Sequence, residues 1–232
     1  MKKINIFIIH YSKLNDRKEH MEQLMSNSPF NYEYIENFDK ETLTQKIIES
    51  IYEPNENKFL QKSKLWKARA IEYSELKIEE ISCAKKHIFA LEKIKNNSNE
   101  YCLIIEDDVI PIYSDFFSKI EKLIKNSGKW DVLFIGEGMG SNYRNKKLGF
   151  KRYLPFKKTF KIKHPATNCL EAYIVKKQSI EKILKDLQPI NMPIDWELAY
   201  QFFNKNLLVH WSKESIFKQG SKNNYFKSSL RK

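Results

Sequence analysis

Residues 101–108 read Tyr-Cys-Leu-Ile-Ile-Glu-Asp-Asp, a short apolar run that ends abruptly in three consecutive carboxylates. An apolar run of this length is typical of a strand buried on both faces, as in a parallel sheet covered by helices. The carboxylates Glu106, Asp107 and Asp108 would then stand at the carboxyl end of that strand, where α/β sheets bind their ligands.

Similar apolar runs recur along the chain and alternate with helical patterns. The predicted strands lie at 3–9, 31–35, 130–135 and 169–175, with a last short one at 207–210. Between them, apolar residues at helical spacing predict helices near 21–25, 81–94, 116–124, 178–187 and 196–202. Alternating strands and helices indicate an α/β fold with a mainly parallel central sheet.

The length supports a single domain over residues 1–232, of which about 211–232 form a polar, basic tail. The formal net charge is +12, but Lys and Arg together number 41 and only five are arginines. Because arginine does most base and phosphate readout, this composition argues against a nucleic-acid specialist. A charge of this sign still attracts anionic partners, including an acidic membrane surface.

Three cysteines, an odd number at no metal-ligand spacing, argue against a disulfide scaffold and against a zinc site. No segment approaches the roughly 20 apolar residues of a membrane span. The apolar run at 4–9 is interrupted by Asn5 and lacks a small-residue cleavage site, so it predicts a first strand rather than a signal peptide. We therefore expect a cytoplasmic protein.

Three adjacent carboxylates repel one another, and a hard divalent cation is the obvious compensation. Glu106 and Asp108 are two residues apart and would face the same side, while Asp107 would face away. The alternative is that Asp107 and Asp108 cap a following helix, against which Pro111 argues.

The order of several motifs resembles glycosyltransferase family 25. The most specific are Glu-Ile-Ser-Cys-Ala-Lys-Lys-His at 80–87 and Leu-Ile-Ile-Glu-Asp-Asp-Val-Ile at 103–110. Further matches are Asp16–Arg17, Trp130–Leu133, Ala172–Val175, Pro193–Asp195 and Gln219, so the resemblance covers nearly the whole chain. The family includes lipooligosaccharide galactosyltransferases of Gram-negative bacteria. Lys86 departs from the pattern, because the family commonly has Ser before the His.

The resemblance implies a GT-A fold, a nucleotide-sugar donor (usually UDP-galactose), a divalent cation such as Mn²⁺ or Mg²⁺, and inversion at the anomeric carbon. It makes Glu106–Asp108 the acidic DxD-type motif, with Asp108 and Glu106 on the metal. Residues placed near the donor are Asp16, Arg17, His87, Asp107, Thr167, Asn168, Gln219 and Ser221. The basic tail would fold over the donor. For His87, which shares a helical face with Ala84 and Leu91, packing in the core is the alternative.

Inverting transfer needs a base that takes the proton of the acceptor hydroxyl. Asp195 is the first candidate, because it follows Pro193–Ile194 at a helix entrance, although a plain helix cap would explain it equally well. Glu137, at the end of the strand at 130–135, is the second candidate, with loop exposure as its alternative.

The sequence therefore predicts a metal-dependent, inverting hexosyltransferase, with galactose as the first choice of sugar. Its acceptor would be a lipooligosaccharide, lipopolysaccharide or other surface glycan, and it would touch an anionic inner membrane peripherally. One alternative is a metal-dependent nucleotidyl or phosphoryl transferase, although the sequence has no P-loop. The others are a non-catalytic sugar-binding protein and a nucleic-acid-binding protein.

Overall fold

The computed structural model describes residues 4–66, 72–138, 158–162 and 169–227. Seven strands form the central sheet: β1 Ile4–Ile9, β2 Asn31–Ile35, β3 Tyr101–Glu106, β5 Val132–Phe134, β6 Thr159–Lys161, β7 Ala172–Lys176 and β8 Val209–Ser212. A second sheet pairs β4 Val109–Pro111 with β9 Phe217–Gln219. The α-helices are α1 Asn15–Met25, α2 Gln45–Ile51, α3 Glu56–Ser63, α4 Ile78–Lys95, α5 Phe116–Asn126, α6 Ile180–Leu184 and α7 Ile194–Asn204.

The central sheet has the strand order β2-β1-β3-β7-β5-β8-β6. β1, β2, β3, β5 and β8 run in one direction, whereas β7 and β6 run against their neighbours. The predicted mainly parallel α/β fold is therefore confirmed, with β7 inserted antiparallel at its centre. The first residue of β7 consequently lies at the edge where β1, β3 and β5 end.

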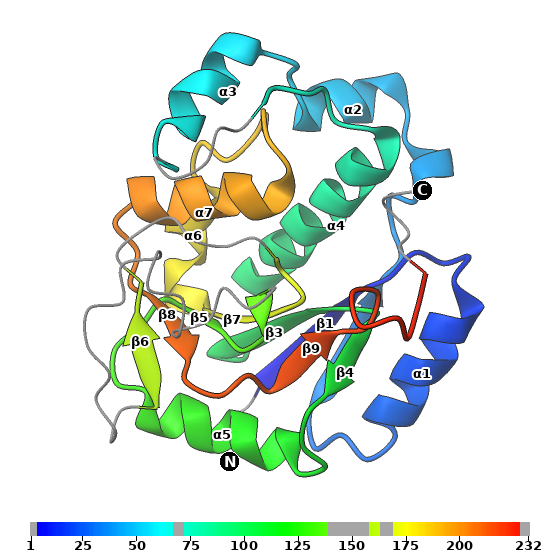
Figure 1. Cartoon of the computed structure of the whole chain (residues 1–232), viewed down its shortest axis with the longest axis vertical. Coiled ribbons are helices and arrows are strands. Elements are labelled where there is room, and N and C mark those ends of the chain that lie inside the picture. Colours follow the sequence, from blue (N-terminus) through cyan, green and yellow to red (C-terminus); the bar gives the residue numbers. More distant parts are fainter. Residues whose placement is uncertain (1–3, 67–71, 139–157, 163–168, 228–232) are drawn as a thin grey trace.

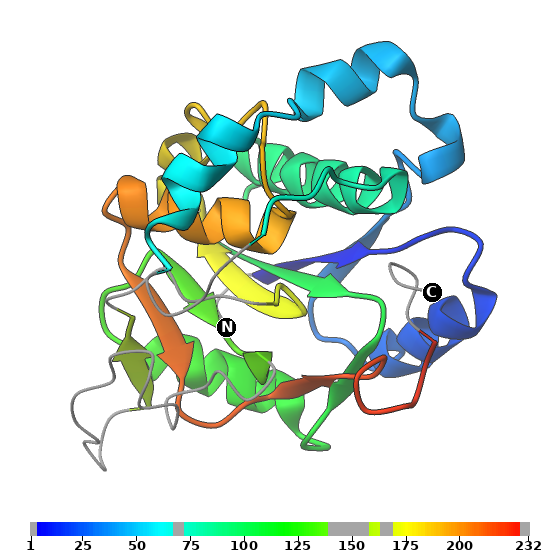
Figure 2. The same cartoon turned by 45° about the horizontal axis from the view of Figure 1, so that its top comes forward.

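Both faces of the sheet are buried, which explains the apolar runs. Successive residues of β3 alternate between the two cores: Ile104 packs with α4, α6 and α7, while Leu103 and Ile105 pack with α1 and α5. Figures 1 and 2 show these helices as two layers, with α4 and α7 above the sheet and α1 and α5 below it. The short helices α2 and α3 lie outside the upper layer (Figure 1).

The sequence predicted the strand positions better than their lengths. The strands expected at 130–135 and 169–175 are observed as the shorter β5 and β7. The strand β6 was not predicted, and it falls within the lysine-rich connection between β5 and β7. Most of that connection, residues 139–157 and 163–168, lies outside the described residues. Among the helices that the structure describes, none is both long and apolar enough to cross a bilayer.

A substitution in β3 tests this two-faced core. Ile104→Ala removes a fully buried side chain, so we expect the free energy of unfolding to fall by about 2–5 kcal/mol. Ile112→Ala is the matched control, because Ile112 is 44% exposed and its loss should change stability by no more than about 0.5 kcal/mol. Urea denaturation measures both, and equal effects would contradict the burial of β3.

Candidate active site at the carboxyl edge of the sheet

Glu106 is the last residue of β3, and Asp107 and Asp108 form the turn to β4, at the carboxyl edge of the central sheet; residues 106–108 are called the acidic turn below. β4 follows this turn and pairs with β9, so the helix-cap alternative for Asp107 and Asp108 is wrong. The Asp107 backbone N–H donates to the Ile9 carbonyl at 3.1 Å, which continues the β1–β3 pairing one residue past the strand. The turn is thereby fixed to the end of β1.

Asp107 points away from its two neighbours and is buried in an ion-paired cluster. Its Oδ1 accepts from the Arg17 guanidinium at 2.6 Å, and its Oδ2 lies 2.8 Å from Nδ1 of His10. The second guanidinium nitrogen of Arg17 donates to the Lys227 carbonyl at 2.6 Å. Because all three side chains are buried, this cluster joins β1, α1, β3 and the C-terminal segment.

Glu106 and Asp108 meet the C-terminal segment instead. Gln219 Nε2 donates to Glu106 Oε2 at 3.2 Å, and the Ser221 backbone N–H donates to Asp108 Oδ2 at 3.1 Å. Asp108 Oδ1 is buried and has no hydrogen-bond partner among the described residues. A buried carboxylate oxygen without a donor is costly, and it is where a cation would compensate.

Burial raises the pKa of Glu106 to about 8, and the negative charges of Asp108 and Asp107 add to the effect. In the absence of a further cation, burial therefore disfavours the ionised form of Glu106 at neutral pH. A divalent cation would stabilise this ionised form.

Glu171 also belongs to this edge, and sequence reasoning missed it. It precedes β7, and the antiparallel direction of that strand brings it beside Glu106, whose N–H donates to the Glu171 carbonyl at 3.0 Å. A Cβ on Gly136 would lie 2.3 Å from Glu171 Oε1, so only glycine leaves room for this carboxylate. Gly138 donates its N–H to the same oxygen at 2.6 Å. Burial raises the pKa of Glu171 to about 7.

Asp195 lies in the first turn of α7, and the helix cap is Pro193. Its Oδ1 accepts from the Trp196 N–H at 3.0 Å. Burial raises the pKa of Asp195 to about 7, and the charge of Glu106 adds to the shift. The N-cap of α7 is therefore Pro193 and not Asp195. The Asp195 carboxyl group lies close enough to Glu106 for the charge of Glu106 to raise its pKa.

A pocket opens beside the acidic turn, between β1 and α4. Its charged lining is balanced, with the cations Arg17, Lys40 and Lys86 and the carboxylates of Glu79, Glu106 and Asp107, and Tyr11 adds an aromatic ring. Lys86, the departure from the family pattern, is buried and donates to Asp39 and to the His10 carbonyl. Its ammonium also lies 5.8 Å from the centre of the Tyr11 ring. An aromatic ring beside charged groups suits a nucleotide base, and each of the three cations is ion-paired with a carboxylate.

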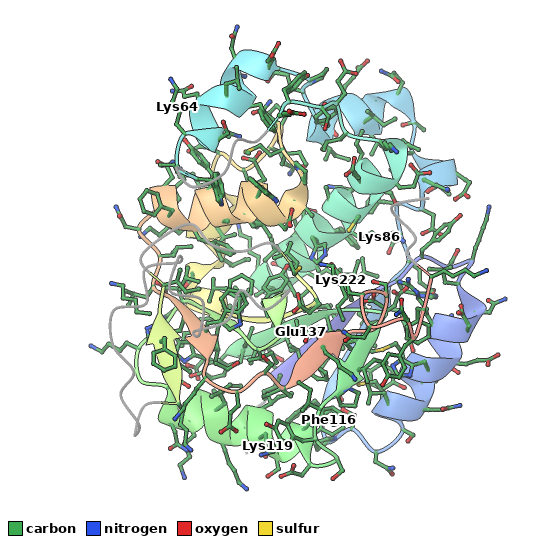
Figure 3. All side chains as sticks on the ribbon, in the orientation of Figure 1. Lys64, Lys86, Phe116, Lys119, Glu137 and Lys222 are labelled. Carbon is green, nitrogen blue, oxygen red and sulfur yellow. The ribbon has the colours of Figure 1, made fainter. Side chains whose placement is uncertain are left out.

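The C-terminal segment brings a further cation to the same edge. Lys222 Nζ lies 3.0 Å from Cys169 Sγ, and its charge lowers the pKa of Glu106, Glu171 and Asp195 against the effect of burial. Figure 3 shows Lys86, Lys222 and Glu137 one after another across the middle of the molecule. Glu137 is half-buried and accepts from Asn223 at 3.0 Å.

The structure thus gathers most of the residues predicted from the sequence, and four need separate mention. Asp16 is exposed in the first turn of α1 and does not line the pocket. Thr167 and Asn168 lie outside the described residues. His87 is fully buried, as its core alternative required, yet its Nε2 lies only 3.7 Å from Glu106 Oε1.

Comparison with known sequences agrees with this geometry. The family model described as glycosyltransferase family 25 (LPS biosynthesis protein) matches residues 3–198, which include the acidic turn and Asp195. The chain belongs to glycosyltransferase family 25. As a member of this family it is a glycosyltransferase, and its mixed α/β sheet with ligand-facing carboxyl ends is the GT-A-like architecture expected from the resemblance.

Solved structures resemble this family 25 chain distantly. A glycosyltransferase involved in glycosylation of the major capsid of PBCV-1 is 14% identical, with 94% of this chain and 93% of that one covered and a TM-score of 0.48. Residues 1–349 of TarS from S. aureus are also 14% identical, with coverages of 97% and 62% and a TM-score of 0.48. A197 from STIV is 17% identical, with coverages of 93% and 83% and a TM-score of 0.46. No curated protein matches the chain in sequence.

The Asp107 cluster gives a stability prediction. Arg17→Ala leaves a buried carboxylate with one partner fewer, so we expect the free energy of unfolding to fall by about 3 kcal/mol or more. Arg17→Lys should restore little of the lost free energy of unfolding, because an ammonium group cannot reproduce the two directed contacts with Asp107 and the Lys227 carbonyl.

The matched control is Lys13→Ala, which removes an exposed ion pair with Glu41 and should leave the free energy of unfolding nearly unchanged. Chemical denaturation compares the three variants. Equal stability of Arg17→Ala and Lys13→Ala would show that the cluster does not hold the fold together.

Proposed function

We propose that this chain is an inverting, metal-dependent glycosyltransferase that moves a hexose, galactose in the first instance, from a UDP-sugar to a surface-glycan acceptor. The observation that carries the proposal is the acidic turn of a family 25 chain, with an Asp108 oxygen that has no hydrogen-bond partner among the described residues, directly beside a pocket whose lining includes Arg17, Lys40 and Lys86. Negative groups for a metal and positive groups for phosphates are the two requirements of a nucleotide-sugar site.

The residues of the turn fit Mn²⁺ or Mg²⁺. These ions are held by one or two carboxylates together with substrate phosphates, and Asp108 and Glu106 supply two carboxylates from one turn. When bound, the metal supplies Lewis-acid stabilisation of the departing diphosphate. Asp107 has no free oxygen to offer, since Arg17 and His10 occupy both.

The pocket beside the acidic turn would take the nucleoside diphosphate. Tyr11 offers a ring for the base, and Arg17, Lys40 and Lys86 bring positive charge to the same lining, next to the carboxylates with which they pair. Gln219 and Ser221 hold the C-terminal segment over the acidic turn. This segment brings the Lys222 ammonium close to Glu106, where it would stabilise the negative charge of the departing diphosphate. These residues would bind and orient the donor before transfer.

Asp195 would act as the general base. In the transfer, the acceptor oxygen forms a bond to the anomeric carbon on the face opposite the diphosphate, the bond to the diphosphate oxygen breaks, and the hydroxyl proton passes to Asp195. A carboxylate whose pKa is raised to about 7 is a stronger base than an ordinary aspartate and is still half ionised at neutral pH. Glu137 is the second candidate for this role, from the opposite side of the edge.

The proposed acceptor is a lipooligosaccharide, a lipopolysaccharide or another glycan carried on a lipid. The net charge of +12 supports work at an anionic membrane surface, where juxtamembrane lysines are attracted. We accordingly propose a cytoplasmic enzyme that touches the inner membrane peripherally. Sedimentation with anionic vesicles tests the last point independently of turnover.

Asp108→Asn tests the metal site. The change keeps the size and an acceptor for the Ser221 N–H but removes the charge, so Mn²⁺-dependent binding of UDP-galactose and its turnover should fall at least about 100-fold. Calorimetric titration with UDP-, GDP- and CMP-sugars, with and without Mn²⁺, measures the binding. Asp115→Asn, an exposed carboxylate before α5, is the control and should bind as the wild type does.

Two outcomes contradict this part of the proposal. Full turnover by Asp108→Asn would exclude the carboxylate as a metal ligand. Turnover of a nucleoside triphosphate in place of any nucleotide sugar would identify a nucleotidyl or phosphoryl transferase on the same fold.

The pH dependence of kcat/KM tests Asp195. The base acts only when ionised, so kcat/KM should rise with pH through about 7 and level off above it, and it should fall as Asp195 becomes protonated at lower pH. Asp195→Asn should lower kcat by about 10²–10⁴-fold and abolish this ascending limb. Asp186→Asn, an exposed carboxylate paired with Lys205, is the control. If the ascending limb of the pH profile is unchanged in Asp195→Asn, the general base is another group. Glu137→Gln is then the next variant to measure.

A further inference from the structure

Three metal-ligating side chains meet beside the acidic turn, and two of them, Cys83 and His87, have no part in the proposed transfer. Cys83, His87 and Glu106 each offer one ligand atom, and these atoms all lie within 4.8 Å of one another. Cys83 and His87 are four residues apart on α4 and therefore share one face of that helix. Glu106 approaches from the end of β3. A helix face and a strand end thus converge on one point.

The imidazole of His87 is oriented toward this point. The side chain is fully buried, and its Nε2 has no hydrogen-bond partner among the described residues. Nε2 lies 3.7 Å from Glu106 Oε1, which is longer than a hydrogen bond. A buried polar nitrogen normally finds a partner, so the Nε2 atom of His87 is available as a ligand atom.

The other ring nitrogen has the partner that a metal-bound histidine requires. His87 Nδ1 lies 3.1 Å from the Tyr173 hydroxyl, and the two rings stack with centroids 5.9 Å apart. If Nδ1–H donates to Tyr173, the proton stays on that nitrogen and the Nε2 lone pair faces Glu106. Such a second contact fixes the tautomer and the ring orientation of metal-binding histidines. Two acceptors that face each other then call for a cation between them.

We propose that Cys83, His87 and Glu106 form a binding site for Zn²⁺. Thiolate and imidazole ligands suit zinc, whereas Mg²⁺ and Mn²⁺ prefer oxygen ligands alone. Around a tetrahedral zinc ion the ligand atoms are about 3.3–3.8 Å apart, so small side-chain rotations would close the observed spacing. Three protein ligands leave a fourth coordination position. Cys83 and Glu106 both line the pocket beside the acidic turn, so this fourth position would open into that pocket.

This site differs from the carboxylate site proposed for Mn²⁺ or Mg²⁺. Zinc would use Oε1 of Glu106 together with a sulfur and a nitrogen, and Asp108 takes no part. The zinc site does not depend on the transferase activity, because it is defined by binding of the ion alone. The two proposals can therefore fail separately.

The experiment uses the full-length protein, freed of metal with a chelator, and Zn²⁺ or Co²⁺ alone. We expect one Zn²⁺ per chain in a competition titration, and a thiolate-to-cobalt charge-transfer band with Co²⁺. Cys83→Ser should abolish the band and weaken zinc binding about 100-fold or more, and His87→Asn should weaken it similarly. Cys169→Ser, which removes another buried thiol, and Asp108→Asn should retain both signals.

X-ray absorption of the zinc-loaded wild type needs no variant, and it should show one sulfur ligand at about 2.3 Å. Thermal unfolding of every variant controls for loss of the fold. The proposal is overturned if the wild type binds no zinc, if zinc is bound without sulfur, or if the cobalt band survives in Cys83→Ser. It is equally overturned if Asp108→Asn loses zinc while Cys83→Ser keeps it.

Discussion

The buried carboxylate of Asp107 is the constraint on which the rest of the site depends. One side chain accepts from Arg17 on α1 and contacts His10 at the end of β1, and Arg17 in turn holds the Lys227 carbonyl. Removing either partner would leave charge in an interior that solvates it poorly. Because Asp107 is turned into this cluster, its neighbours Glu106 and Asp108 are turned the other way, toward the C-terminal segment. The orientation of Glu106 and Asp108 thus depends on the ion pairs that Asp107 makes with Arg17 and His10.

Several buried carboxyl groups lie together at the carboxyl edge of the sheet, where burial disfavours their ionised forms. Glu106, Glu171 and Asp195 all have pKa values raised by burial, and Lys222 is the cation that opposes this effect on each of them. Gly136 has no side chain, which leaves room for the Glu171 carboxylate, and the Gly138 N–H donates to the same carboxylate. Raised pKa values of several neighbouring carboxyl groups are a feature of functional sites, which agrees with a binding site at this edge.

The local pattern of apolar residues predicted where the strands and helices lie. It could not predict which strands pair with one another or in which direction they run. The apolar runs marked β1, β3, β5 and β7 because each is buried on both faces, and the carboxylates after β3 marked the binding edge. The antiparallel direction of β7 has no signature in a continuous apolar run, so Glu171 went unpredicted. Likewise the spacing of the cysteines argued against a zinc site, because nothing in that spacing shows that α4 brings Cys83 close to the end of β3. Asp195 was predicted as a site residue, and its role still awaits the kinetic test.

The pairing of β4 with β9 also has a consequence for how the chain is made. The contacts of Gln219 and Ser221 with the acidic turn join residues 113 positions apart. During synthesis the turn leaves the ribosome long before the segment that covers it, and closing so long a loop is an entropic cost paid late. Until residues 217–221 have been made, Glu106 and Asp108 lack their contacts with Gln219 and Ser221, whereas Asp107 can already pair with Arg17 and His10. The nascent chain therefore carries two acidic side chains that only a later segment covers.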